Sequence, residues 1–284
     1  MLLLAAIGYL AFGQPHPSTP ATPPPPPGCE AGTGGAAVPL DTGQAGIAAT
    51  IAGVAARHRL PRQAVTIALA TALQESQLEN LDYGDRDSVG VFQQRPSQGW
   101  GTTAELEDPV YATTKFFAAL VKVHGYTKMP VDQAAQDVQH SADGDAYEQW
   151  ASVAALLAGD FAGTSRASVY CWYTPAGKPD LNGALKQLTE TFGPDGTGGV
   201  LVAMTTGRSG QKKKDRSVAV VHVQQDAAWT VVSWLVTYAQ QYGISQIRYA
   251  GYEWNAANGS IGWQRVKESG RTASPAPRGS IVAA

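Results

Sequence analysis

Apolar positions recur at helical spacing through the first half of the chain. Residues 44–59 place isoleucine and valine side chains on one face, a period that predicts an amphipathic helix. Pro61 is well placed to begin a second helix that runs to about residue 79, because proline suits the first helical turn. Further helices are predicted at residues 110–123, 131–140 and 147–157. The stretch 41–160 therefore predicts an all-helical domain.

The pattern changes to short apolar runs with β-branched residues after residue 200. These runs predict strands at residues 200–205, 217–223, 244–249, 252–254 and 261–266. A helix predicted over 226–242 ends at Gly243. We therefore expect a small α/β domain at 200–268, and an α+β multi-domain fold for the whole chain, with the all-α domain first.

The remaining segments have compositions that predict no packed core. Residues 1–13 are apolar but lack a basic start, which favours a signal segment or a truncated membrane anchor. Residues 14–40, rich in proline and glycine, predict a stalk, and 161–199 predict a linker with one short helix. Residues 269–284 predict a disordered tail. This order predicts an extracytoplasmic protein: in the cell wall, secreted, or tethered by its N-terminus.

Charge and cysteine content narrow the function classes. The chain of 284 residues has a net charge of −2, which argues against nucleic-acid binding through a basic face. Its two cysteines, Cys29 and Cys171, are too few for a zinc site built on cysteine, and we expect neither metal nor cofactor. In an exported protein they would form a disulfide that brackets the helical domain. Two unpaired thiols are the alternative.

One carboxylate, Glu75, stands near the end of an otherwise apolar helix. Positions 64, 68, 71 and 75 share a helical stripe and read Ala, Ala, Thr and Glu. A carboxyl group at the end of a strip of small side chains is partly desolvated, which raises its pKa toward the range of a general acid. The alternative is an exposed glutamate at a helix end.

The pair Glu75-Ser76, followed by Gly90-Val91-Phe92-Gln93, resembles two motifs of lytic transglycosylases. These lysozyme-like enzymes cleave the glycan strands of peptidoglycan, and the resemblance covers residues 41–160. It implies a lysozyme-like fold with Glu75 as the single acid/base. Glu75 would protonate the oxygen between N-acetylmuramic acid and N-acetylglucosamine, then accept the proton of the muramic 6-hydroxyl as a 1,6-anhydro ring closes. The resemblance further implies that Ser76 supports the acid and that Gln93 lines the groove.

Other groove residues are less defined. Tyr83, Gln94 and Trp100 carry rings or amides that suit sugar contacts, or they pack within a loop. The third motif of the family, Ala-Tyr-Asn, has no clear copy. The nearest stretch, 138–147, would place Gln139, His140 or Ser141 at that wall of the groove.

The acidic residues of the intervening loop, Asp82, Asp85 and Asp87, allow three interpretations. One of them could supply the second carboxylate of a lysozyme-like hydrolysis. Their spacing also suggests a calcium loop, but the glycine and terminal glutamate of an EF-hand are missing. A solvated acidic loop is the third, in which Asp85, Arg86 and Asp87 could equally form a local ion-pair cluster.

The C-terminal unit resembles small α/β modules of actinobacterial wall proteins that are similar to degenerate zinc D-Ala-D-Ala peptidases. His222 and Asp226 are too few to hold zinc, so we expect no catalysis from this unit. Tyr252, Trp254 and Trp263 flank a hairpin-like loop and either bind glycan or peptide, or pack internally. Lys212, Lys213 and Lys214 form a cationic loop, which is either a solvated turn or a contact for an anionic wall polymer or membrane surface.

The sequence thus predicts an exported peptidoglycan lytic transglycosylase. Two alternatives remain: a non-catalytic peptidoglycan-binding protein of the cell wall, and an accessory protein of an envelope complex.

Overall fold

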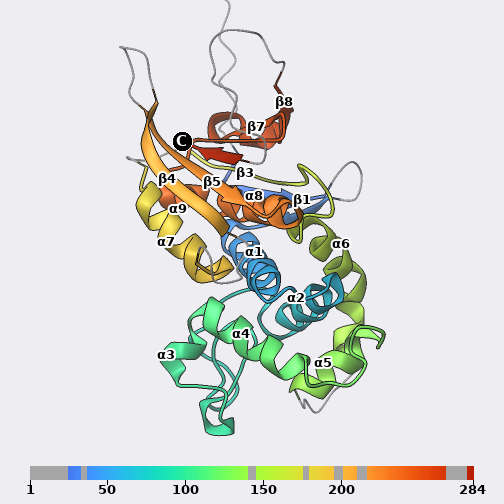
Figure 1. The fold of residues 1–284 in the computed structure, drawn as a ribbon. Helices are drawn as coiled ribbons and strands as arrows, with labels where there is room; N and C mark the ends of the chain where they lie inside the picture. The colour runs from blue at the N-terminus through green and yellow to red at the C-terminus, as the bar shows by residue number, and fades with distance from the viewer. Residues whose placement is uncertain are drawn as a thin grey trace, which may run out of the picture.

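The computed structural model describes residues 25–32, 37–139, 145–174, 179–194, 201–209, 216–266 and 280–284. It has the mixed α+β architecture that the sequence predicts (Figure 1). The helical body consists of α1 (Thr42–Arg57), α2 (Arg62–Ser76), α3 (Thr103–Leu106), α4 (Pro109–Leu120), α5 (Val131–Gln139) and α6 (Ala151–Phe161). A 3-10 helix, Asp145–Trp150, leads into α6. The predicted signal or anchor segment lies outside the described residues.

Helices α1 and α2 form the centre of the body. Asp41 begins α1 with a capping box, in which its carboxylate accepts from the backbone N–H of Gln44 at 2.7 Å. Helix α2 follows Pro61 and ends where Gln77 adopts a left-handed conformation. Both helices are rich in alanine and buried on nearly all sides, and α2 packs against α4, α5 and α6. The last turn of α2 therefore lies where several elements meet.

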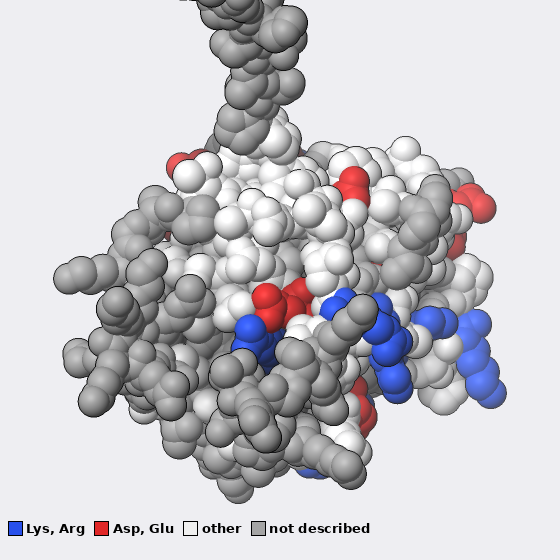
Figure 2. All heavy atoms as spheres, turned by 90° about the horizontal axis from the view of Figure 1, so that it is seen from above, with Lys and Arg blue, Asp and Glu red and all other residues white. Residues whose placement is uncertain are grey.

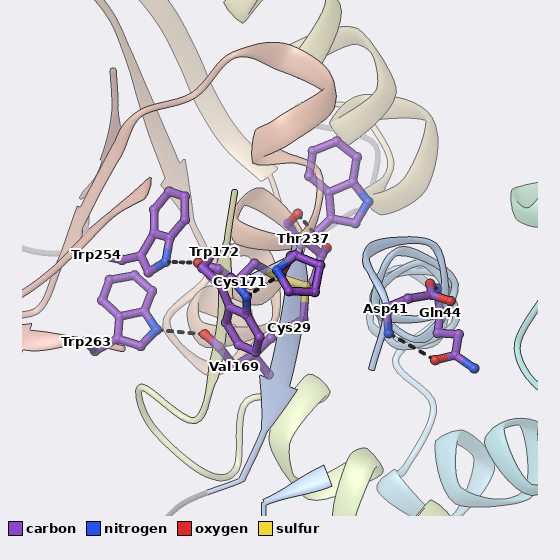
Figure 3. The surroundings of a disulfide bond; sticks show 11 residues. Cys29, Asp41, Gln44, Val169, Cys171, Trp172, Thr237, Trp254 and Trp263 are labelled. Carbon is purple, nitrogen blue, oxygen red and sulfur yellow. Dashed lines mark hydrogen bonds between the residues drawn. A yellow bond between two sulfur atoms is a disulfide. The ribbon is translucent and has the colours of Figure 1, made fainter. Parts of the chain in front are cut away.

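A three-stranded antiparallel sheet closes one side of the body. Its order is β2 (Val38–Leu40), β1 (Gly28–Ala31), β3 (Val169–Trp172). Cys29 is paired in register with Cys171, and a disulfide joins these two buried residues (Figure 3). The predicted disulfide is thus confirmed. The prediction of an unpacked stalk is wrong for its described part. Residues 28–31 and 38–40 form β1 and β2, because β1 pairs with β3 on one side and with β2 on the other.

The second sheet has six antiparallel strands in the order β4-β5-β9-β6-β7-β8. These strands are β4 (Leu201–Ser209), β5 (Arg216–Val223), β6 (Gln246–Tyr249), β7 (Tyr252–Asn255), β8 (Gln264–Arg265) and β9 (Ser280–Ala283). Helices α7 (Leu181–Phe192), α8 (Ala228–Thr237) and α9 (Ala239–Tyr242) accompany it. Two predictions fail here. The tail contributes β9 between β5 and β6, and the linker contributes β3, which was not predicted. The short helix predicted in the linker is present as α7, but it is packed into the core through Leu181, Leu188 and Phe192 and does not stand alone.

Helix α8 lies against α1, so the sheet unit and the helical body share one core (Figure 1). The hydroxyl groups of Thr50 and Tyr238 are 2.8 Å apart across this contact. The indole N–H groups of Trp254 and Trp263 donate to the backbone oxygens of Cys171 and Val169 (Figure 3). These two tryptophans brace β3, which favours the packing alternative for them over a role in ligand binding.

The upper face of the sheet unit has mixed charge. Figure 2 shows acidic and basic side chains of described residues next to one another on that face. Arg248 on β6 and Glu253 on β7, which are paired in register, form an ion pair with 2.6 Å between Nε and Oε2. The three lysines of the predicted cationic loop lie outside the described residues, so their role stays a prediction.

Candidate functional site

Glu75 lies in the last turn of α2 and is largely buried. Burial raises the pKa of this carboxyl group above its usual 4.5, because the charged form loses its hydration. Hydrogen bonds from Tyr147 and Gln139 act in the opposite direction, since both favour the ionised form. Burial is the larger effect. The arrangement gives a carboxyl group that keeps its proton to higher pH than an exposed glutamate does.

Tyr147 is the residue that the sequence analysis did not identify. It belongs to the 3-10 helix before α6, its ring is only 1% exposed, and its hydroxyl donates to Oε1 of Glu75 at 2.7 Å. Ala146-Tyr147 matches the first two letters of Ala-Tyr-Asn, with Glu148 in the third position. This pair, at the end of the stretch 138–147, is the sequence signal that could have identified Tyr147 as a site residue.

Hydrogen bonds to two consecutive carbonyl groups tie loop 90–93 to the ends of α2 and α5. Ser76, which is buried, donates from Oγ to the oxygen of Val91 at 2.8 Å. Gln139 donates from Nε2 to the oxygen of Phe92 at 2.7 Å, and the Phe92 ring stacks on Phe116. Ser76 therefore fixes loop 90–93 to the end of α2, next to Glu75, and Gln139 fixes it to the end of α5.

The loop conformation depends on Gly90. Its φ is +77°, and a Cβ atom there would lie 2.2 Å from the carbonyl oxygen of Leu106. Gln93 is also left-handed, with a φ of 47°, and its Nε2 donates to the oxygens of Tyr83 and Gly90, at 3.2 Å in each case. The side chain of Gln93 thus holds the loop together, and stays half-buried at its surface.

The other predicted sugar contacts are dispersed. Gln94 is 2% exposed, and neither polar atom of its amide has a partner in the described part of the chain. It points into the protein, which argues against its predicted contact with substrate. Tyr83 is 69% exposed on the acidic loop, Trp100 is half-buried against the core, and His140 lies outside the described residues.

The acidic loop does not deliver a second carboxylate to Glu75. Asp87 accepts from Arg95 at 2.9 Å and from the backbone N–H of Ser97 at 2.7 Å, and these donors lower its pKa to about 2. Asp85 lies beside Arg86 in an exposed pair, and Asp82 is exposed. Within the described residues, no carboxylate is among the groups that shift the pKa of Glu75. The predicted local ion pair is present between Asp85 and Arg86, whereas Asp87 pairs with Arg95 and not with Arg86.

In the described ranges, no group of three His, Cys, Asp or Glu side chains is arranged to hold a metal ion. None of the helices in those ranges is long and apolar enough to span a bilayer. A hollow of about 320 Å³ opens between α1 and the α8–α9 region, lined by Thr42, Gly43, Gly46, Thr237, Tyr238, Gln240 and Gln241. It does not include Glu75, and each polar atom of Tyr238 that faces it is already hydrogen-bonded.

Comparison with known proteins adds no family to this picture. No protein-family model matches the chain, and no curated protein matches it either.

Proposed function

We propose that this protein is a peptidoglycan lytic transglycosylase in which Glu75 is the only acid/base. The single observation that carries the proposal is the environment of the Glu75 carboxyl group. This group is largely buried, which raises its pKa, and it accepts a hydrogen bond from the Tyr147 hydroxyl. A raised pKa leaves the group protonated nearer to neutral pH, as a general acid needs to be. The substrate class, peptidoglycan, is proposed because Glu75-Ser76 and residues 90–93 resemble motifs of lytic transglycosylases.

The proposed reaction uses the Glu75 proton twice. Glu75 first protonates the glycosidic oxygen between N-acetylmuramic acid and N-acetylglucosamine, so that the bond to the muramic C1 breaks. The resulting carboxylate then accepts the proton of the muramic 6-hydroxyl, whose oxygen attacks C1 and closes the 1,6-anhydro ring. The Tyr147 hydroxyl can donate to Glu75 in both states, because both the acid and the carboxylate offer an acceptor oxygen.

The absence of a carboxylate beside Glu75 in the described residues favours ring closure over hydrolysis. Glycosidases with two carboxyl groups place them roughly 5–10 Å apart, one to protonate and one to attack or to activate water. Here Asp87 is occupied by Arg95 and Ser97, so it is unsuited to either task. We therefore propose the substrate's own 6-hydroxyl as the nucleophile.

The disulfide supports the proposed location. Such bonds persist in oxidising compartments and are rare in the cytosol, so the Cys29–Cys171 bond fits an exported protein of the cell wall. Peptidoglycan strands are the proposed partner. An anionic wall polymer, contacted through the cationic loop of Lys212, Lys213 and Lys214, is a second proposed partner.

The test is Glu75→Gln in the purified protein, with Glu79→Gln as the matched control. Glu79 is exposed and lies four residues further along the chain. We expect Glu75→Gln to stop the release of soluble muropeptides while it still sediments with peptidoglycan, and Glu79→Gln to behave as the parent. Binding by the parent without release of products would instead favour the wall-binding alternative.

A further inference from the structure

The last turn of α2 holds the 3-10 helix before α6 at two adjacent residues. Glu75 accepts from the Tyr147 hydroxyl at 2.7 Å. Gln74 accepts through Oε1 from the indole N–H of Trp150 at 2.8 Å, and the amide of Gln149 donates to the same oxygen at 3.1 Å. The Gln74 carbonyl oxygen thus uses both of its acceptor positions on this one helix.

The geometry of a 3-10 helix places Tyr147 and Trp150 on one face. Such a helix has about three residues per turn, so side chains at positions i and i+3 are eclipsed. Tyr147 and Trp150 stand in that relation, and both side chains meet the last turn of α2. The Nε2 of Gln149 also donates to the carbonyl oxygen of Ala146 at 3.0 Å, which ties the Gln149 contact to the turn that carries Tyr147. A shift of the helix that releases Trp150 therefore moves Tyr147 as well.

We propose that Gln74 is a positioning residue: it holds the 3-10 helix in the place from which the Tyr147 hydroxyl reaches Glu75. The Gln74 carbonyl oxygen does so by accepting from Trp150 and Gln149. The catalytic meaning of this role rests on the proposed function, in which Glu75 is the acid/base. Because Gln74 acts through the 3-10 helix, its effect on Glu75 requires the Tyr147 hydroxyl.

The test is a double-mutant cycle of Gln74→Leu and Tyr147→Phe. Gln74 is half-buried, and leucine keeps an apolar side chain of similar size there without the acceptor oxygen. The ¹³C carboxyl signal of Glu75, assigned by its loss in Glu75→Gln, gives the pKa without substrate. The activity readout is kcat on soluble glycan strands.

We expect Gln74→Leu alone to raise the pKa of Glu75, because the ionised form loses its bond from Tyr147, and to lower kcat roughly 3- to 10-fold. In the Tyr147→Phe background, Gln74→Leu should change neither quantity further. Gln133→Leu, at an exposed position on α5, is the control and should behave as the parent.

Two outcomes would overturn the proposal. An unchanged Glu75 pKa in Gln74→Leu means that Tyr147 keeps its place without Gln74. Equal changes in both backgrounds mean that Gln74 acts on Glu75 independently of Tyr147. If Gln74→Leu does not fold, Trp150→Phe removes the indole donor from the other side of the contact, and the Glu75 pKa must then rise for the proposal to survive.

The titration needs no turnover, so its result is distinct from a failure of the proposed function. If the parent protein releases no muropeptides, the role of Glu75 as an acid/base on peptidoglycan is lost. The cycle of pKa values still decides whether Gln74 positions the Tyr147 hydroxyl.

Discussion

The hydroxyl of Tyr147 lies 2.7 Å from Oε1 of Glu75, although 72 residues separate them in the sequence. The bond joins the last turn of α2 to the 3-10 helix before α6, and both elements belong to the shared core. The hydroxyl group of this buried tyrosine both orients the Glu75 carboxyl group and lowers its pKa, against the larger effect of burial. This relationship leads to the first prediction.

Tyr147→Phe keeps the buried ring and removes the donor. We expect the pKa of Glu75 to rise further, because the ionised form loses a hydrogen bond, and kcat/KM to fall roughly 10- to 100-fold. Carboxyl NMR titration and glycan turnover measure the two effects. Tyr126→Phe is the control, since no hydrogen bond contributes to the pKa of Tyr126. Parent-like titration and turnover in Tyr147→Phe would remove Tyr147 from the site.

Glu75 itself predicts a pH-dependent cost in stability. Because its pKa in the folded protein is raised above 4.5, the folded state holds more protons than the unfolded chain between those two pKa values. The free energy of unfolding therefore falls as pH rises through that window. Glu75→Gln lacks this titration, so its stability relative to the parent should increase as pH rises from below 4.5. Urea unfolding at a series of pH values measures the difference, and a difference that does not change with pH contradicts the burial argument.

The disulfide should stabilise the fold considerably, because it closes a loop between positions 142 residues apart. Replacing both cysteines by serine should lower the free energy of unfolding by about 2–5 kcal/mol. Denaturant unfolding measures this loss, and the parent under reducing conditions should approach the double variant. Equal stability of oxidised parent and double variant would show that the β1–β3 pairing holds without the covalent bond.

The acidic loop should be dispensable for the chemistry. In Asp87→Asn, the Arg95 and Ser97 contacts weaken, yet the type of product should stay the same, because Asp87 takes no part in proton transfer. Mass spectrometry of the products checks this, with Asp82→Asn and Asp85→Asn as parallel variants. A change in product type in any one of the three identifies a second catalytic carboxylate.

Local signals account for what the sequence predicted correctly. Asp41 and Pro61 mark the starts of helices that their alanine-rich sequences favour, and the pairing of Cys29 with Cys171 followed from the expected compartment. The partial burial and the raised pKa of Glu75 were predicted from its helical spacing behind a strip of small side chains. These features depend on a few neighbouring residues or on a single covalent bond.

Long-range packing accounts for the rest. Strand β9 follows a stretch rich in serine, proline and arginine, and only the edges of β5 and β6 make its four residues a strand. Gln93 and Gln94 are the same residue type side by side, so the sequence does not distinguish them. The backbone is left-handed at Gln93, and the side chain of Gln94 is buried while that of Gln93 stays at the surface of the loop. Tyr147 reaches Glu75 through the packing of α2 against the 3-10 helix, and the local pair Ala146-Tyr147 signals the residue but not this contact.

The most direct test of the central claim is the chemical identity of the ends that the purified protein leaves on peptidoglycan. Single-carboxylate catalysis by Glu75 predicts muropeptides that end in 1,6-anhydromuramic acid, and predicts that Glu75→Gln produces none. Mass spectrometry distinguishes these ends from hydrolysed ones by the mass of one water. Reducing-end muramic acid, or anhydro products formed equally well by Glu75→Gln, would contradict the account.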